Sequence, residues 1–146
     1  MWRPITENDV LGVLSAPEAA AYRSAAISSG QNVLADILGQ VVNHCRGYIA
    51  DNAQNALAAG LTLPERCMRA ALHLIRKDLL TRLDLEVSDD RRKDASEAIR
   101  FFERVADGRV AVEQPTGTVD TSSPGPGITM LSNHERQATR EKLSGL

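Results

Sequence analysis

Gln31-Asn-Val-Leu-Ala-Asp-Ile-Leu-Gly-Gln-Val-Val-Asn-His-Cys-Arg-Gly-Tyr-Ile-Ala-Asp51 decides the fold, because its apolar residues return every three or four positions. This spacing gathers side chains on one face of an α-helix, and a face this broad is buried against other elements. The sequence therefore predicts a long core helix over 31–51, whose apolar face consists of Val33, Leu34, Ile37, Leu38, Val41, Val42, Cys45, Tyr48 and Ile49.

Working outward, apolar spacing predicts further helices over about 7–14, 16–28, 63–84 and 89–107. Gly30 is predicted to break the chain after the second, and Gly108 to cap the fifth. At Ser88, first-turn acids complement the helix dipole. The capping-box pattern, a hydroxyl residue with an acid three positions later, marks the other helix starts: Thr6 with Asp9, Ser15 with Glu18, Thr62 with Glu65, and Ser132 with Glu135. The predicted class is all-α, a small bundle of four to five helices.

Two short apolar groups add detail to this bundle. Residues 52–61 hold two Asn, a Gln and a Gly, and predict a loop with Leu57 and Leu61 tucked under it. A short amphipathic group on the first helix either closes the core or faces a neighbouring subunit: Val10, Leu11 and Leu14.

The charges are mixed throughout, with a net charge of −2. Basic and acidic residues number five and six in 1–75, nine and nine in 76–109, and three and four in 110–146. No segment is a basic block, so no phosphate-binding face is visible. No apolar run approaches the ~18 residues of a membrane span, and the N-terminus has no hydrophobic signal region. We expect a cytoplasmic protein without a membrane partner.

The composition changes after the bundle, which divides the chain into a helical core over 1–109, an extended linker arm over 110–131 and a docking segment over 132–146. Val110 and Val112 allow a short strand. The following Pro, Gly, Ser and Thr residues cannot bury enough apolar surface to fold alone. The segment 132–144 suits a short terminal helix, which would order only against a partner because isolated helices of this length are marginal.

No catalytic, cofactor-binding or metal-binding residues are predicted. A zinc site is disfavoured because adjacent helical residues diverge by about 100°, and a Cys–His nucleophile pair lacks an orienting group. We interpret the two cysteines as buried thiols in a reducing compartment. The residues weighed for these sites are His44, Cys45, Cys67 and His73. The acidic run Asp84, Glu86, Asp89 and Asp90 is better explained by capping and solvation than by a cation site.

With these elements placed, the chain resembles the phage head–tail connector family, also called adaptor or head-completion proteins, of Mu-like prophages and long-tailed phages. The resemblance covers about 5–146 and lies in the order of structural motifs. These are Arg46-Gly-Tyr-Ile49, Leu61-Thr-Leu-Pro-Glu65, Ala70-Ala-Leu-His-Leu-Ile-Arg76, Leu79-Leu-Thr-Arg-Leu83, Asp89-Asp-Arg-Arg-Lys93, Ala98-Ile-Arg-Phe-Phe-Glu-Arg-Val-Ala-Asp-Gly108, Val110-Ala-Val-Glu-Gln-Pro115 and Thr139-Arg-Glu-Lys-Leu-Ser-Gly-Leu146. The loop Gln54-Asn-Ala-Leu-Ala-Ala59 departs from the family pattern, being less rich in Gly and Pro.

The resemblance implies a virion structural protein of the neck, assembled in the host cytoplasm. Family members form a ring of twelve subunits under the portal protein, with a stopper or tail-terminator protein below, and DNA passes through the lumen without specific binding. The C-terminal arm reaches the portal, and its linker over 113–131 can span up to roughly 60 Å. The residues expected to bind the portal are Leu131, Arg136, Arg140, Leu143 and Leu146.

This interpretation predicts that deleting 113–146 leaves a folded bundle that no longer joins filled heads. The alternative is a small helical nucleic-acid-binding or DNA-packaging accessory protein. A DNA affinity that falls steeply with salt would favour that alternative, while the near-balanced charge argues against it.

Overall fold

The structure, a computed structural model, describes residues 1–29 and 32–117. Gly30 and the predicted terminal helix over 132–144 lie outside these residues. The elements, in chain order, are β1 (Trp2–Pro4), α1 (Glu7–Val13), α2 (Ala16–Ser29), α3 (Val33–Asp51), β2 (Thr62–Pro64), α4 (Glu65–Arg82) and α5 (Asp89–Ala106). The predicted all-α class is confirmed, with one small two-stranded ribbon added.

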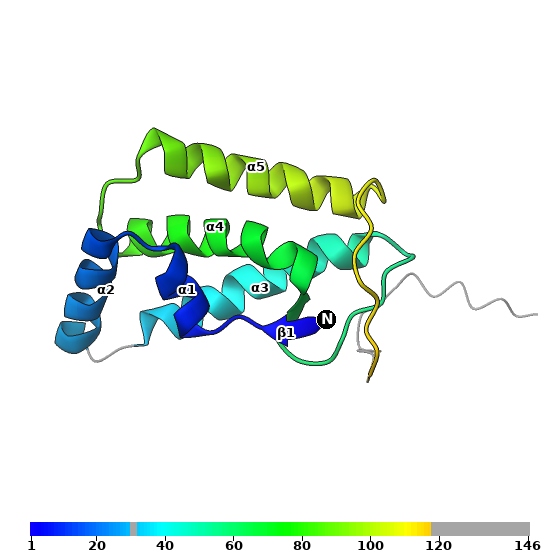
Figure 1. Ribbon diagram of the computed structural model, residues 1–146, viewed down its shortest axis with the longest axis horizontal. Coiled ribbons are helices and arrows are strands. Elements are labelled where there is room, and N and C mark those ends of the chain that lie inside the picture. The colour runs from blue at the N-terminus through cyan, green and yellow to red at the C-terminus, as the bar shows by residue number, and fades with distance from the viewer. Residues whose placement is uncertain (30–31, 118–146) are drawn as a thin grey trace, which may run out of the picture.

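Helices α3, α4 and α5 pack against one another along the length of the bundle, and α1 packs on α4 (Figure 1). α2 lies at one end of the bundle. The chain after α5 runs past β1 at the opposite end (Figure 1). The predicted α3 face is confirmed as core, and Val10 of α1 is also buried, so the first helix closes the core. The large side chains at the centre are fully enclosed: Ile49, Leu63, Ile75, Leu79, Phe102 and Val105.

Several predicted helix boundaries are confirmed by their caps. The Thr6 hydroxyl accepts the Asp9 amide, and the Asp9 carboxylate accepts the Thr6 amide, which completes a capping box. The Ser88 hydroxyl accepts the Arg91 amide at the start of α5. Gly108 has φ +75°, the left-handed conformation expected after the last turn of α5.

The predicted capping box at Thr62 and Glu65 is wrong. Residues 62–64 form β2, which pairs antiparallel with β1, and α4 begins only at Glu65 with Pro64 as its N-cap residue. The Thr62 hydroxyl donates to the Ala59 carbonyl, and the Glu65 carboxylate accepts from the guanidinium of Arg3. Pairing with a strand about sixty residues earlier therefore replaces the local cap.

The loop between α3 and β2 is only partly as expected. Leu57 is buried, whereas Leu61 is half exposed rather than tucked under the loop. The unexpected feature is Arg46 of α3, which is buried and donates to the Ala58 carbonyl at 2.8 Å and the Thr62 carbonyl at 3.0 Å. A guanidinium carries five N–H donors, so Arg46 can bind both carbonyls at once and hold this part of the chain to the bundle.

The short strand allowed at Val110 and Val112 is absent, because residues 109–117 contain no strand. Val112 instead buries its side chain in the core cluster. Within the described ranges, none of the helices is both long enough and apolar enough to span a membrane.

Candidate functional site

The histidines and cysteines weighed as zinc ligands are separated by the fold. Cys45 and Cys67 are fully buried, while His44 lies exposed with its ring edge-on to Tyr48 at 5.0 Å. Burial raises the pKa of both thiols to about 12, and the neighbouring thiol adds to the effect at Cys45. In residues 1–29 and 32–117, no three His, Cys, Asp or Glu side chains gather as a metal site. A neutral buried thiol is a poor nucleophile, which agrees with a packing role.

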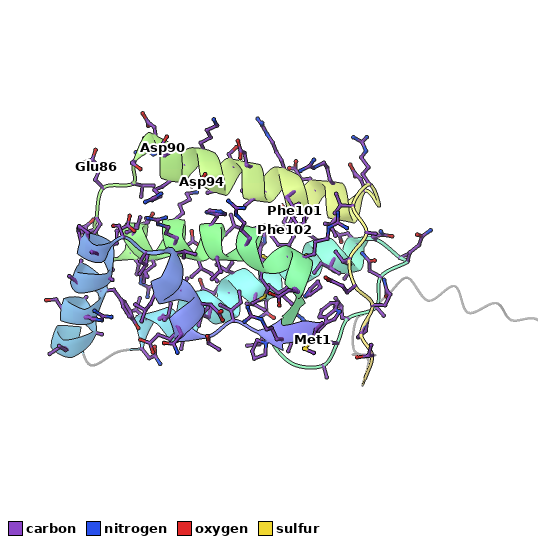
Figure 2. The ribbon with its side chains drawn as sticks, in the orientation of Figure 1. Met1, Glu86, Asp90, Asp94, Phe101 and Phe102 are labelled. Carbon is purple, nitrogen blue, oxygen red and sulfur yellow. The ribbon has the colours of Figure 1, made fainter. Side chains whose placement is uncertain are left out.

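His73 of α4 lies in a different setting, beside α5. Its Nδ1 atom is 3.7 Å from a carboxylate oxygen of Asp94, too far for a hydrogen bond. His73 and Asp94 line a surface hollow of about 410 Å³, together with Arg69, Glu97 and Arg104. Asp94 and the Phe101–Phe102 pair project from α5 on the side facing the bundle, whereas Glu86 and Asp90 point outward (Figure 2).

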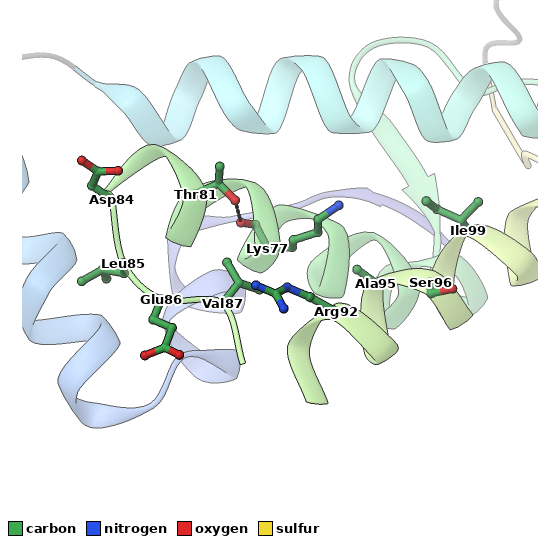
Figure 3. Close-up of a pocket in the computed structure, with 10 residues that line it drawn as sticks. All are labelled: Lys77, Thr81, Asp84, Leu85, Glu86, Val87, Arg92, Ala95, Ser96 and Ile99. Carbon is green, nitrogen blue, oxygen red and sulfur yellow. Dashed lines mark hydrogen bonds between the residues drawn. The ribbon is translucent and has the colours of Figure 1, made fainter. Parts of the chain in front are cut away.

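A broader groove of about 900 Å³ runs beside the turn between α4 and α5 (Figure 3). Ala95 and Ile99 contribute apolar surface, and Lys77, Arg92 and the acids Asp84 and Glu86 contribute charge. A second hollow of about 340 Å³ shares Lys77 and Ile99 and extends toward α3. The lining of this groove is therefore mixed, with charged and polar side chains around a small apolar patch.

The acidic run around this turn is dispersed. Asp89 and Asp90 occupy the first turn of α5, where they complement the helix dipole, and Asp89 pairs with Arg92 at 3.3 Å. Asp84 adopts φ +57° at the end of α4, and Glu86 lines the groove separately. Asp89 and Asp90 therefore occupy the dipole position that the sequence predicted, while Asp84 and Glu86 are exposed to solvent.

A buried ion network is the strongest polar feature that the sequence did not reveal. Glu18 of α2 accepts from Arg76 of α4 at 2.6 Å and 3.1 Å, and Arg91 of α5 lies 3.5 Å from its other oxygen. The Ser15 amide also donates to Glu18 at 2.8 Å. Burial raises the pKa of Glu18, but these hydrogen bonds and both guanidinium charges outweigh burial, so the net pKa is lowered. The network fastens α2 to the bundle.

A second network fastens the N-terminus. Arg3 of β1 donates to Asp9 of α1 and to Glu65 of α4, each at 2.9 Å. The hydrogen bond from Arg3, supported by the Thr6 amide and hydroxyl, lowers the pKa of Asp9 to about 2. The capping box of α1 is thus tied to the β ribbon.

The segment after α5 meets the bundle beside this network. Trp2 donates its indole N–H to the Glu113 carbonyl at 2.7 Å, and Arg66 donates to the Ala111 carbonyl at 3.0 Å. No local sequence pattern predicts these contacts, since their partners are separated by 45 residues or more. The residues expected to bind the portal lie outside the described residues: Leu131, Arg136, Arg140, Leu143 and Leu146.

Comparison with known protein families, curated proteins and solved structures finds no match for this chain.

Proposed function

We propose that this chain is a phage head–tail connector subunit of the adaptor type, which joins the DNA-filled head to the tail. Twelve copies form a ring under the portal protein, above a stopper or tail-terminator protein, and DNA passes through the lumen. The sequence resemblance suggests this function. The observation that carries the proposal is a rigid helical bundle to which the root of a long polar C-terminal segment is fastened beside β1.

This arrangement suits a joint whose role is geometric. A connector must hold its position under load, and α3, α4 and α5 share one close-packed core. It must also reach a partner at some distance from the bundle, which a segment rich in Pro, Gly, Ser and Thr can do by ordering on binding. Weak contacts by each arm are strengthened when twelve arms bind one ring.

The test compares the full chain with residues 1–117 by measuring the mass of each protein alone and with portal. The cut follows Gly117 rather than residue 112, because Glu113 and the side chain of Gln114 contact the bundle. We expect both proteins to give the helical spectrum of the bundle, and only the full chain to form a ring-sized complex with portal.

A finer comparison uses the full chain with Arg140→Glu and Leu143→Ser, which we expect to weaken the portal complex. Arg23→Glu, an exposed change on α2 of the bundle, is the control. If residues 1–117 bind portal as well as the full chain does, the docking role is wrong. A DNA affinity that falls steeply with salt, without portal binding, would instead support the accessory-protein alternative.

A further inference from the structure

The chain does not leave the bundle at the end of α5. Gly108, with φ +75°, turns the backbone, and the amides of Arg109 and Val110 both donate to the Arg104 carbonyl. The next residues then lie against the bundle, with the Val112 side chain buried in the core cluster. We name residues 109–114 the strap.

The strap is held by three segments that are distant in sequence. From β1, the Trp2 indole donates to the Glu113 carbonyl at 2.7 Å. From the first turn of α4, Arg66 donates to the Ala111 carbonyl at 3.0 Å.

The third segment is the loop between α3 and β2. There the Gln114 side chain accepts from the Ala56 amide at 3.0 Å and donates to the Asn55 side chain at 3.2 Å. The anchors thus fall on successive residues from 111 to 114.

We propose that the strap opens and closes as one unit, and that in the closed state it fixes where the following chain leaves the bundle. Anchors on consecutive residues cannot separate independently, because lifting Val112 from the core moves the carbonyls on both sides of it. Opening would free six residues and extend the reach of the following chain by about 20 Å, at ~3.3 Å per residue. The strap is therefore a built-in adjustment of arm length, whatever partner the arm binds.

Trp2 is the only tryptophan in the chain, so its indole N–H gives a single, unambiguous signal. The experiment measures the solvent exchange rate of this proton by NMR in the full chain. Arg66→Ala and Gln114→Ala each remove one anchor without touching Trp2. We expect each to accelerate indole exchange roughly fivefold, since a surface hydrogen bond contributes about 1 kcal/mol to the closed state.

The matched controls are Arg69→Ala on α4 and Gln54→Ala in the loop, two exposed side chains that make no hydrogen bond to the strap. We expect both controls to stay within twofold of the parent. A helical circular dichroism spectrum equal to that of the parent verifies that each variant is folded. Val112→Ala repeats the test by removing the contact between the strap and the core. If either anchor variant leaves the indole rate within twofold of the parent, the anchors act independently and the strap is not a unit.

Discussion

Replacing Glu18 with glutamine should destabilise the whole bundle, because one carboxylate joins three helices. Glu18 accepts hydrogen bonds from Arg76 and from the Ser15 amide, and it forms a longer ion pair with Arg91 at 3.5 Å. The Arg76 side chain is only 8% exposed, and that of Glu18 is 17% exposed. Glu18→Gln keeps the size and shape of the side chain but removes its charge, so Arg76 stays buried without a counter-charge.

The expected loss is about 3 kcal/mol in the free energy of unfolding. Removing one partner of a buried ion pair costs roughly 3–5 kcal/mol, and the low end applies because Glu18 retains some exposure to solvent. For a domain of this size the loss corresponds to a fall in Tm of roughly 10 °C. The double variant Glu18→Leu/Arg76→Leu should recover much of it, because both charges leave together.

The pH dependence provides the sharpest check. The folded-state pKa of Glu18 lies below the ordinary value of 4.5, so its contribution is complete above pH 4.5 and is lost as pH falls through the folded pKa. The difference in unfolding free energy between the parent and Glu18→Gln in urea should therefore be full at pH 7 and smaller at pH 3. Glu97→Gln on α5, an exposed carboxyl, serves as the control. An equal deficit at both pH values, or a deficit under ~0.5 kcal/mol at pH 7, would refute the reasoning.

Three further changes test other parts of the fold. Thr6→Ala removes the capping box of α1 and should cost about 1 kcal/mol in urea unfolding, with Thr81→Ala as the comparison. Phe102→Ala empties a fully enclosed site and should cost about 3–5 kcal/mol by the same assay; a loss below 1 kcal/mol would contradict the packing. Cys45 and Cys67 should resist a thiol reagent at pH 8 in the folded protein and react fully in urea, because burial raises their pKa; rapid native labelling would contradict this.

The helices were predictable because their information is local. The apolar spacing of α3 and the cap at Ser88 each lie within a few residues of what they determine. The β ribbon was not predictable, because three-residue strands show no period and β2 pairs with a strand about sixty residues earlier in the chain. The sequence spacing predicted Glu65 as half of a capping box, yet its carboxylate pairs with Arg3. Arg3 comes close to Glu65 only in the folded chain, because the two residues are far apart in sequence.

The same limit applies to charges inside the bundle. Arg46 and Arg76 lie among apolar positions of α3 and α4, and nothing nearby in sequence shows which oxygens they meet. Arg76 contacts a carboxylate on α2, whereas Arg46 contacts the backbone carbonyls of Ala58 and Thr62. For the candidate site, composition predicted a polar arm, but the position of the chain just before it follows only from the contact between Trp2 and Glu113.

That contact changes the geometry available to the proposed connector. An arm beginning at Gly108 would pivot on the end of α5. An arm beginning at Pro115 instead starts beside β1, because the strap before it is bound by three segments. From there the linker to residue 131 spans at most ~56 Å, at about 3.3 Å per residue. Fixing the starting point also reduces the volume that each arm can sample. The effective concentration of the arm is therefore higher at a partner site within reach and lower at sites outside that volume. A ring of such subunits would present its arms in a defined circle, and the circle's diameter would follow from where Trp2 sits in each copy.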